Sequence, residues 1–353
     1  MSDKTVAVFL GDDASPEVMA PTVALLESLS LPITFVYPST EADSDGRSHN
    51  GFSDTAKRMV DQADATFFGS TSGASTQALF YLRWGKQTFA NVRPCKWRPG
   101  YQSPMRNPES IDFTIVRENL EDLYLGLEGN LEDLAALNLY SRHARASLKD
   151  LGPGRYAIKA ITDAGSERVI RFAFELARSR GQKQKVTLTS KYNMLAKADG
   201  HFRDIGFEVA KDYPDITFET FIVDDFLCRM ITQPQALDVV VTPNLYGDIL
   251  SDGSAGLMGG LGLAPSGCYG ETYAYFESAH GTAPDIQGQN IINPTATILS
   301  AAMLMTYLGY SEAADQLEAA IDRVYAAGQT LPVDQGGSAS TSQFFEAVQS
   351  LMD

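Results

Sequence analysis

The chain is poor in the residues that build disulfide frameworks and transition-metal sites. Its 353 residues include three cysteines, Cys95, Cys228 and Cys268, and four histidines. The cysteines are far apart, odd in number and form no CxxC, so we expect neither disulfides nor a zinc cluster, and a reducing cytoplasm fits best. The histidines form no HxH or HxxxH pair, which argues against a histidine-built metal site.

Basic residues are also scarce. Lys plus Arg number 28 against 44 for Asp plus Glu, which gives a net charge of −16. This surplus of acid argues against sequence-independent nucleic-acid binding, which needs a basic face, and against docking on anionic lipid. Acidic residues can supply oxygen ligands for a hard cation. If the substrate is an anion, the few cations must be concentrated in one place.

Long hydrophobic runs and a standard nucleotide-binding fingerprint are missing too. No window reaches the roughly 18 apolar residues of a membrane span. The beginning, MSDKTVAVFLGDD, lacks the basic start and long apolar stretch of a signal peptide. The first expected strand ends in Gly11-Asp12-Asp13-Ala14, so no GxGxxG follows it. A nucleotide, if one binds, must therefore be held by another design.

What is present is an alternation of apolar strands and amphipathic helices. Near the start we expect strands over 5–10, 32–37 and 64–69 and helices over 16–30 and 53–63. Later strands are predicted over 111–117, 186–189, 217–223 and 237–242, and helices over 164–180 and most of 294–328. This rhythm predicts an α/β fold with a largely parallel sheet. The proline-containing stretch 97–110 and the glycine-rich stretch 256–267 predict two crossovers between domains.

Two pairs of aspartates could bind a cation. Asp248 and Asp252 are four residues apart and would share one face of a helix. Two carboxylates that close favour a cation with oxygen ligands, such as Mg²⁺ or Mn²⁺, although acidic residues also favour a helix N-terminus for other reasons. Asp224 and Asp225 follow an apolar strand and could instead be a solvated strand end.

Three further segments carry polar residues that could serve catalysis or binding. Arg117 and Tyr124 are seven residues apart and would share a helical face, which is typical of a salt-bridged surface helix. Lys191 follows the strand VTLTS and could equally be an ordinary surface lysine. The loop 277–294, ESAHGTAPDIQGQNIINP, combines His, Asp and amide side chains with Gly and Pro.

Several long motifs in order along the chain resemble one family. They are GDDASPEV, NVRPCK, VRENLEDLY, SKYNML, NLYGDILSD, GGLGLAPSG and HGTAPDI with a following NP. Together they resemble the metal-dependent β-decarboxylating dehydrogenases, which include the 3-isopropylmalate, isocitrate, homoisocitrate and tartrate/D-malate dehydrogenases. The resemblance implies the two-domain isocitrate/isopropylmalate dehydrogenase-like fold without a Rossmann fingerprint. It implies a cofactor-binding domain made of 1–98 and 258–353, and a substrate, metal and dimerisation domain over 99–257.

The resemblance also implies roles for individual residues. Asp248 and Asp252 match metal carboxylates, and Asp224 matches a third one that the partner subunit of a homodimer supplies. Arg83, Arg93 and Arg117 match arginines that bind the malate carboxylates, a task that suits the planar guanidinium group. Tyr124 matches the tyrosine that protonates C3, and Lys191 matches the lysine that takes the hydroxyl proton, again across the dimer.

For the cofactor, the resemblance implies a set of adenosine-loop residues together with an asparagine near the nicotinamide. These residues are Glu277, His280, Gly281, Asp285, Ile286, Asn293 and Asn193, with Asp334 as a weaker match. NADP-specific members carry Lys-Tyr where this chain has Asp285-Ile286. Because an Asp accepts hydrogen bonds from a free ribose 2′-hydroxyl and repels a 2′-phosphate, NAD is favoured.

The segment before Arg83, SGASTQALFYLR, bears on the substrate. Leu79 and Phe80 stand at positions where isopropylmalate enzymes have leucines and tartrate/D-malate enzymes have a Trp at the second. An unpartnered γ-carboxylate buried there would cost several kcal/mol. We therefore expect a 3-alkylmalate, with 3-isopropylmalate as the best candidate. Thr76, where isopropylmalate enzymes have a Glu, and Leu120, where the family often has a Thr, depart from that pattern.

Isocitrate or homoisocitrate, and D-malate or tartrate, remain the alternative substrates. A non-catalytic regulatory subunit is a further alternative from a different class. Such subunits tend to lose the catalytic or metal-binding residues, and this chain has all five of them: Tyr124, Lys191, Asp224, Asp248 and Asp252.

Overall fold

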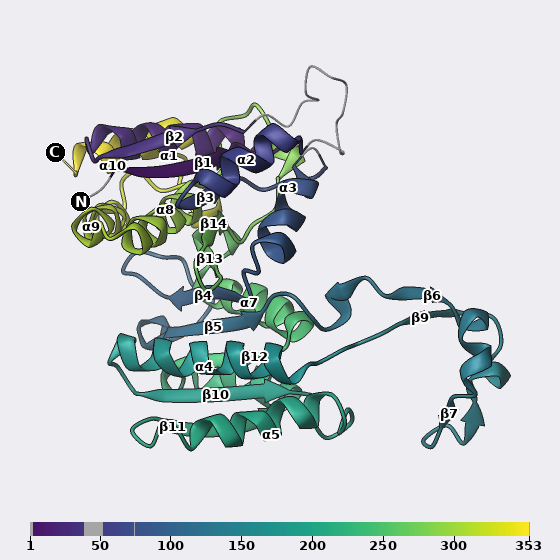
Figure 1. Cartoon of the computed structure of the whole chain (residues 1–353). Coiled ribbons are helices and arrows are strands. Elements are labelled where there is room, and N and C mark those ends of the chain that lie inside the picture. The colour runs from purple at the N-terminus through teal and green to yellow at the C-terminus, as the bar shows by residue number, and fades with distance from the viewer. Residues whose placement is uncertain (1–2, 39–51, 74, 353) are drawn as a thin grey trace.

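A single mixed sheet runs through the whole molecule (Figure 1). The computed structural model describes residues 3–38, 52–73 and 75–352. Its sheet has ten strands in the order β11-β10-β12-β5-β4-β13-β14-β3-β1-β2. The strands are β1 (Lys4–Phe9), β2 (Ile33–Val36), β3 (Ala65–Phe68), β4 (Ala90–Lys96), β5 (Asp112–Glu118), β10 (Lys185–Ser190), β11 (Thr217–Ile222), β12 (Val239–Thr242), β13 (Pro265–Tyr269) and β14 (Ala274–Ser278).

The sheet is parallel except at its centre. The antiparallel pairings are β4 with β5, β4 with β13 and β13 with β14. All other neighbours pair in parallel, from β1–β2 to β12–β5. The expectation of an α/β fold with a largely parallel sheet is confirmed.

Helices cover the sheet on both faces. They are α1 (Pro16–Ser28), α2 (Asp54–Gln62), α3 (Thr76–Phe80), α4 (Asp163–Arg180), α5 (Asp199–Ala210), α6 (Val223–Thr232), α7 (Asn244–Met258), α8 (Thr295–Leu308), α9 (Ser311–Ala327) and α10 (Thr341–Ser350). Alternate residues of β12 show the two faces: Val239 and Val241 pack into one core with α4, and Val240 packs into the other with α6 and α7. This follows from the two-residue period of a strand. Because both faces are buried, the strand reads as a continuous apolar run.

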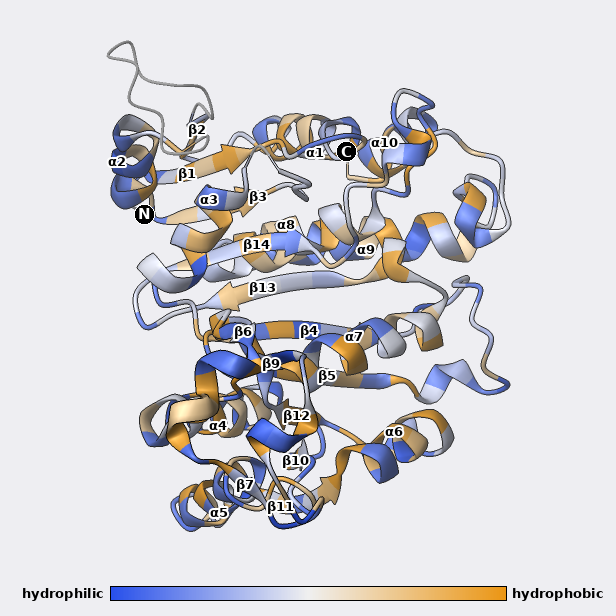
Figure 2. Cartoon of the chain, turned by 90° about the vertical axis from the view of Figure 1, so that its right-hand side faces the viewer, coloured by the Kyte–Doolittle hydropathy of each residue, from blue (hydrophilic) through white to orange (hydrophobic). Residues whose placement is uncertain are grey.

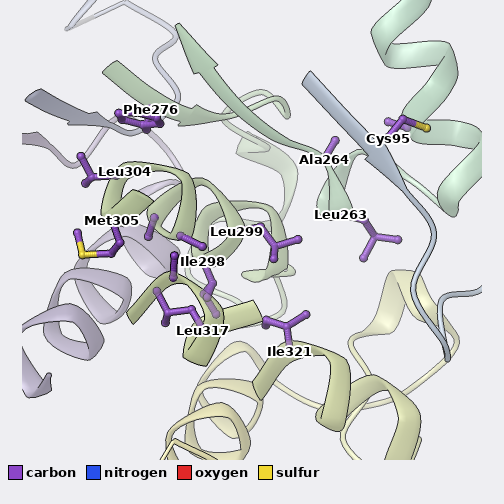
Figure 3. Packing of buried hydrophobic residues seen from close by; sticks show 14 of the residues in the cluster. Cys95, Leu263, Ala264, Phe276, Ile298, Leu299, Leu304, Met305, Leu317 and Ile321 are labelled. Atoms are coloured by element: carbon purple, nitrogen blue, oxygen red, sulfur yellow. The ribbon is translucent and has the colours of Figure 1, made fainter. Parts of the chain in front are cut away.

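The larger core lies around α8. Ile298, Leu299, Leu304 and Met305 of this helix pack against α9 and against Phe276 of β14 (Figure 3). Helix α8 is buried on most of its circumference, and its composition is correspondingly apolar. This core anchors the loop 279–294 that precedes α8.

An arm extends away from the body between β5 and α4 (Figure 1). It contains two small antiparallel ladders, β6 (Glu128–Asn130) with β9 (Arg155–Ala157) and β7 (Tyr140–Ser141) with β8 (Ala146–Ser147). Large apolar side chains are exposed along and beside it, including Leu127 at 51%, Leu137 at 62% and Tyr140 at 61%. The arm is too thin to bury these side chains by itself.

Most predicted elements agree with the structure, but several parts of the chain differ from the prediction. The expected helix over 117–124 is wrong: Arg117 belongs to β5, and Tyr124 lies in a short 3-10 turn, Leu123–Leu125. A helix is interrupted there because Asp122 has φ of 68°. Asp224 and Asp225 lie in the first turn of α6 rather than at a strand end, where the helix dipole favours carboxylates. Strands β4, β13 and β14 were not expected.

The proposed domain division stays a prediction. Its boundaries at 98 and 258 fall just after β4 and at the end of α7. Yet β4 and β5, which would belong to different domains, are joined by a register of seven residue pairs. None of the described helices is long and apolar enough to cross a membrane.

Candidate active site

Three arginines and two aspartates meet where β4, β5 and α7 converge. Arg117 lies near the end of β5, and β12, its neighbour, leads through Pro243 into α7. Ligands of open α/β sheets bind outside the carboxyl ends of the strands, and this is such a place. Helix α7 carries Asp248 and Asp252 on one face, and both carboxylates contact arginines.

The contacts between these groups form one connected cluster. Arg117 pairs with Asp248 and donates two hydrogen bonds of 2.9 and 2.7 Å to Asn244 Oδ1. Arg93 Nη1 lies 3.1 Å from Asp252 Oδ1 and 3.6 Å from Asp248 Oδ1. Tyr124 Oη donates to Asp248 Oδ2 at 2.6 Å. The predicted metal carboxylates, two substrate arginines and the catalytic tyrosine are therefore brought together.

The charges of the cluster shift the pKa values of its members in different directions. Burial favours the neutral form of Asp248, but Arg117, Tyr124 and Arg93 outweigh it and hold the pKa of this carboxyl below its ordinary value. Burial and the charge of Asp248 raise the pKa of Asp252 despite Arg93. Burial and the neighbouring Arg93 and Arg83 lower the pKa of Arg117, although Asp248 opposes them. An acidic ligand would relieve the repulsion among the arginines, and a divalent cation would relieve the repulsion between the two carboxylates.

Arg83 reaches the same region from a π-helical turn. This turn, Tyr81–Gly85, continues α3, and π-turns are frequent at functional sites. Gly85 is required there, because a Cβ atom would lie 2.3 Å from Cδ2 of Tyr81. Arg83 Nε donates to Tyr275 Oη at 3.3 Å. Burial disfavours the charge of Arg83, but Tyr275 and Glu277 raise its pKa.

The expected specificity residues lie on α3. Phe80 is 45% exposed, Leu79 is half-buried, and the Phe80 ring meets that of Trp84 edge-on at 5.4 Å between centroids. Trp84 Nε1 donates to the Leu120 carbonyl at 3.0 Å. Trp84 thus links the segment of Arg83 to the segment that follows Arg117.

Asn91 is a positioning residue that the motifs did not reveal. Fully buried in β4, it accepts from Arg93 Nε at 2.9 Å and donates to Ser266 Oγ at 3.2 Å and Cys268 Sγ at 2.7 Å. Ser251 of α7 also accepts from Arg93, at 2.6 Å. The signal that could have found Asn91 is its spacing of two from Arg93, which puts both on one face of a strand.

Lys191 and Asp224 form a second, separate pair. Lys191 directly follows β10 and makes an ion pair with Asp224 at the start of α6. The hydrogen bond from Lys191 lowers the pKa of Asp224. Within the described ranges 3–38, 52–73 and 75–352, no three His, Cys, Asp or Glu side chains are grouped so as to hold a metal ion. One chain alone therefore does not bring Asp224 to Asp248 and Asp252.

The predicted cofactor loop is held by contacts in its second half. Glu17 of α1 accepts from the backbone N–H groups of Gly288 at 2.6 Å and Asn290 at 3.0 Å. Asn293 Nδ2 lies 3.1 Å from both carboxylate oxygens of Asp334. Asp285 and Ile286 lie in a 3-10 turn.

His280 and Glu277 are half-buried titratable groups of this region. Burial lowers the pKa of His280, whose Nδ1 lies 2.8 Å from the carbonyl oxygen of the neighbouring Gly281. Its Nε2 is buried without a hydrogen-bond partner, so the loop has a polar atom to offer a ligand. Burial raises the pKa of Glu277, which Arg83, Arg93 and Arg117 partly offset, so Glu277 lies toward the arginine cluster. Asn193 is exposed in the turn after Lys191.

Comparison with known proteins gives a consistent result over almost the whole chain. The family model described as isocitrate/isopropylmalate dehydrogenase matches residues 5–348. A 3-isopropylmalate/3-methylmalate dehydrogenase of Methanocaldococcus jannaschii is 40% identical over 97% of both chains. An isocitrate/homoisocitrate dehydrogenase of Thermus thermophilus is 39% identical, also over 97% of both. The crystal structure of isocitrate dehydrogenase from Methylococcus capsulatus superposes with a TM-score of 0.84 at 33% identity and covers 99% of each chain.

Proposed function

Because the chain belongs to the isocitrate/isopropylmalate dehydrogenase family of β-decarboxylating dehydrogenases, we propose that it oxidises and decarboxylates a 3-substituted (R)-malate with NAD and Mg²⁺ or Mn²⁺. The preferred substrate in this proposal is 3-isopropylmalate or another 3-alkylmalate. The observation that carries it is the convergence of Arg83, Arg93 and Arg117 beside Asp248 and Asp252. Such an arrangement suits a dicarboxylate together with a divalent cation.

The residues fit the two groups that the reaction requires. Asp248 and Asp252 offer only oxygen ligands, which suits Mg²⁺ or Mn²⁺, and the raised pKa of Asp252 marks a carboxylate that a cation would relieve. The unpartnered Nε2 of His280 and the carboxylate of Asp285 fit the adenosine half of NAD. A cation held by Asp248 and Asp252 would supply a Lewis acid for the 2-hydroxyl and the developing carbonyl, and NAD would supply the hydride acceptor.

The remaining chemistry falls to the chain's own side chains. The arginines bind and orient the two malate carboxylates. Lys191, which pairs with Asp224, takes the proton of the 2-hydroxyl as a neutral amine, after its ammonium has released a proton to solvent. Tyr124 returns a proton to C3 after carbon dioxide has left. Burial and the hydrogen bond to Asp248 raise the pKa of Tyr124, so the phenol keeps the proton that it must deliver.

Alkyl specificity is supported by the surroundings of α3. Leu79, Phe80 and Trp84 offer apolar surface close to Arg83 in the sequence, and Trp84 is bonded to Leu120. Each substrate methylene buried there would contribute about 0.8 kcal/mol. Relatives of similar identity act on 3-isopropylmalate or on isocitrate and homoisocitrate according to their names, so the γ-carboxylated substrates are the alternative.

We further propose a homodimer in which each site takes Lys191 and Asp224 from the partner. The separation of this pair from Asp248 and Asp252 within one chain supports it. Apolar side chains exposed on α6 and α7, Leu227 at 40%, Ile231 at 43% and Ile249 at 59%, support it too, as does the apolar arm. Figure 2 shows α6 at the edge of the molecule with hydrophobic residues among hydrophilic ones.

The three free cysteines of the chain suit the reducing cytoplasm in which we propose to place the protein.

A substrate panel tests this function. Reduction of NAD and of NADP is measured with Mn²⁺ or Mg²⁺ and malates that carry hydrogen, methyl, isopropyl, carboxymethyl or carboxyethyl at C3, as well as tartrate. We expect the highest kcat/KM with an alkylmalate and NAD, and loss of activity in Lys191→Met and Asp248→Asn. Preference for isocitrate or homoisocitrate would replace the alkyl assignment. Absence of turnover with every compound would contradict the enzymatic proposal.

A further inference from the structure

Lys159, at the base of the arm, lies between two fully buried aspartates. Its Nζ is 2.7 Å from Asp199 Oδ1 and 3.3 Å from Asp122 Oδ1. The lysine side chain is 13% exposed and both aspartates are 0% exposed. The ammonium also lies 4.3 Å from the ring centroid of Tyr246. Burying three charges carries a large desolvation cost, so the arrangement is weak evidence for stability and calls for another reason.

Asp122 connects the turn of Tyr124 to the helix of the metal carboxylates. Its Oδ1 accepts from the N–H of Leu123, next to Tyr124, at 2.8 Å. Its Oδ2 accepts from the N–H of Leu245, in the first turn of α7, at 3.0 Å. Its backbone, with φ of 68° and ψ of −146°, adopts a conformation that glycine favours. The side-chain contacts hold this unfavourable conformation in place.

Asp199 connects to the segment of Lys191. Its Oδ2 accepts from the backbone N–H of Lys191 at 2.7 Å, and its carbonyl accepts from Ser190 Oγ at 3.3 Å. Asp199 is the first residue of α5, so a change in its position would move the turn that connects β10 to this helix.

We propose that Lys159 is a positioning residue that keeps these two aspartates side by side and so fixes three segments in one frame. The segments are the Tyr124 turn, the start of α7 and the Lys191 turn. In the proposed dimer, Tyr124 and Asp248 serve the chain's own site, while Lys191 and Asp224 serve the partner's. Lys159 would therefore join half of one active site to half of the other. This inference rests on the proposed function for its kinetic consequence but not for its structural one.

The test is the variant Lys159→Met, with Lys185→Met as a matched control. Lys185 stands at the start of β10, the strand that leads to Lys191, is 19% exposed and pairs with Glu219 at 2.7 Å. We expect kcat of Lys159→Met to fall roughly 10- to 100-fold, as for other supporting residues around an active site. The KM for the malate should change little, and Lys185→Met should retain activity.

Hydrogen exchange gives a readout that does not depend on turnover. Lys159→Met should lose protection in 120–126 and in 190–200 together, and Lys185→Met in neither. If Lys159→Met is too unstable, Lys159→Met/Asp122→Asn removes one buried negative charge and should regain thermal stability without regaining kcat. Wild-type kcat in Lys159→Met, exchange that changes at only one of the segments, or recovery of kcat in the double variant would overturn the inference. Wild-type enzyme that is inactive on every malate would instead contradict the proposed function.

Discussion

At the scale of single residues, the arginines are held by partners that are themselves fixed. Asn244 binds Arg117, Asn91 and Ser251 bind Arg93, and Tyr275 binds Arg83. A guanidinium held in this way loses less conformational entropy when a carboxylate binds. If the arginines bind the substrate as proposed, its affinity should therefore depend on the neutral residues that hold them.

Asn91→Leu tests this dependence. The substitution keeps the size of the side chain but removes the acceptor of Arg93 Nε. Because a hydrogen bond to a charged group contributes about 1.5–3 kcal/mol, we expect the KM for the malate to rise about 10- to 100-fold. Asn119→Leu is the control, since Asn119 is equally buried and donates to the Thr88 carbonyl at 3.0 Å. Equal changes of KM in both variants would contradict a specific role for Asn91.

Glu118 predicts a pH dependence of stability. Burial raises its pKa from 4.5 to about 7, against hydrogen bonds from the N–H groups of Leu120 and Glu121. Between these two values the folded chain keeps a proton that the unfolded chain has lost. Its contribution to stability therefore falls as the pH rises through this window, by about 3 kcal/mol, and is constant above it.

Glu118→Gln should remove most of that dependence. Glutamine stays neutral and keeps one acceptor oxygen, so we expect a net gain of about 1–3 kcal/mol at pH 8 and little change near pH 4.5. Thermal unfolding midpoints at both pH values measure it, and Glu128→Gln, at an exposed position, is the control. A midpoint at pH 8 no higher than that of wild type would show that burial does not raise the pKa of Glu118.

At the scale of elements, one hydrogen bond, from Trp84 to the Leu120 carbonyl, joins the π-turn Tyr81–Gly85 to the segment after β5. Trp84→Phe should keep the ring against Phe80 but remove the donor to Leu120. A neutral hydrogen bond contributes about 0.5–1.5 kcal/mol, so the KM for an alkylmalate should rise about 2- to 10-fold. Trp97→Phe loses an equivalent bond, to the Tyr101 carbonyl at 3.1 Å, and should leave KM unchanged. A KM that rises as much in Trp97→Phe would refute the assignment.

Elements built from apolar pattern alone could be predicted, and elements shaped by the site could not. Strand β12 and helix α4 agree with their sequence pattern because only packing determines them. Strand β4, ANVRPCK, has no continuous apolar run, because Asn91 and Arg93 occupy the face that points to the site. The turn 118–125 has helical spacing, but Asp122 and Glu118 bind backbone N–H groups and end any helix there.

The same division holds for the site residues. Asp248 and Asp252 could be found from their spacing, because a helix brings residues four apart together. Trp84 and Lys159 could not, because their partners Leu120 and Asp199 lie far away in the sequence. The spacing of Asn91 from Arg93 could have indicated one of its contacts, but its bond to the distant Cys268 could not be predicted. Motif resemblance names the groups that we propose to touch the substrate, and the structure adds the residues that hold these groups in place.

At the scale of the whole molecule, the surplus of acid and the exposed apolar surface have separate meanings. The net charge of −16 is compatible with anion binding because the cations that matter are gathered in the arginine cluster. The apolar side chains of α6 and of the arm are not covered within the chain. Association would cover them and complete the site.

Leu227→Glu/Ile231→Glu tests association. Each glutamate would be buried in the proposed dimer interface without a partner charge and would cost several kcal/mol, so we expect a monomer in light scattering. Activity should fall more than 100-fold, since Lys191 and Asp224 would no longer reach a partner's site. Phe207→Glu places a charge on a similarly exposed residue, at 48%, of α5 and should leave the dimer intact. A fully active monomer would contradict the shared site.

The register of β4 with β5 has one more consequence. Asn91 stands opposite Arg117 and Arg93 opposite Ile115, so the backbone hydrogen bonds of the ladder set the spacing of the two arginines. In the proposed function, this fixed spacing of the arginines matches the two carboxylates that all malates share. In the proposed function, the variable C3 substituent is recognised elsewhere, by the short segment 76–84. Exchanging those nine positions between relatives should then exchange substrate preference and leave the spacing of Arg93 and Arg117 unchanged.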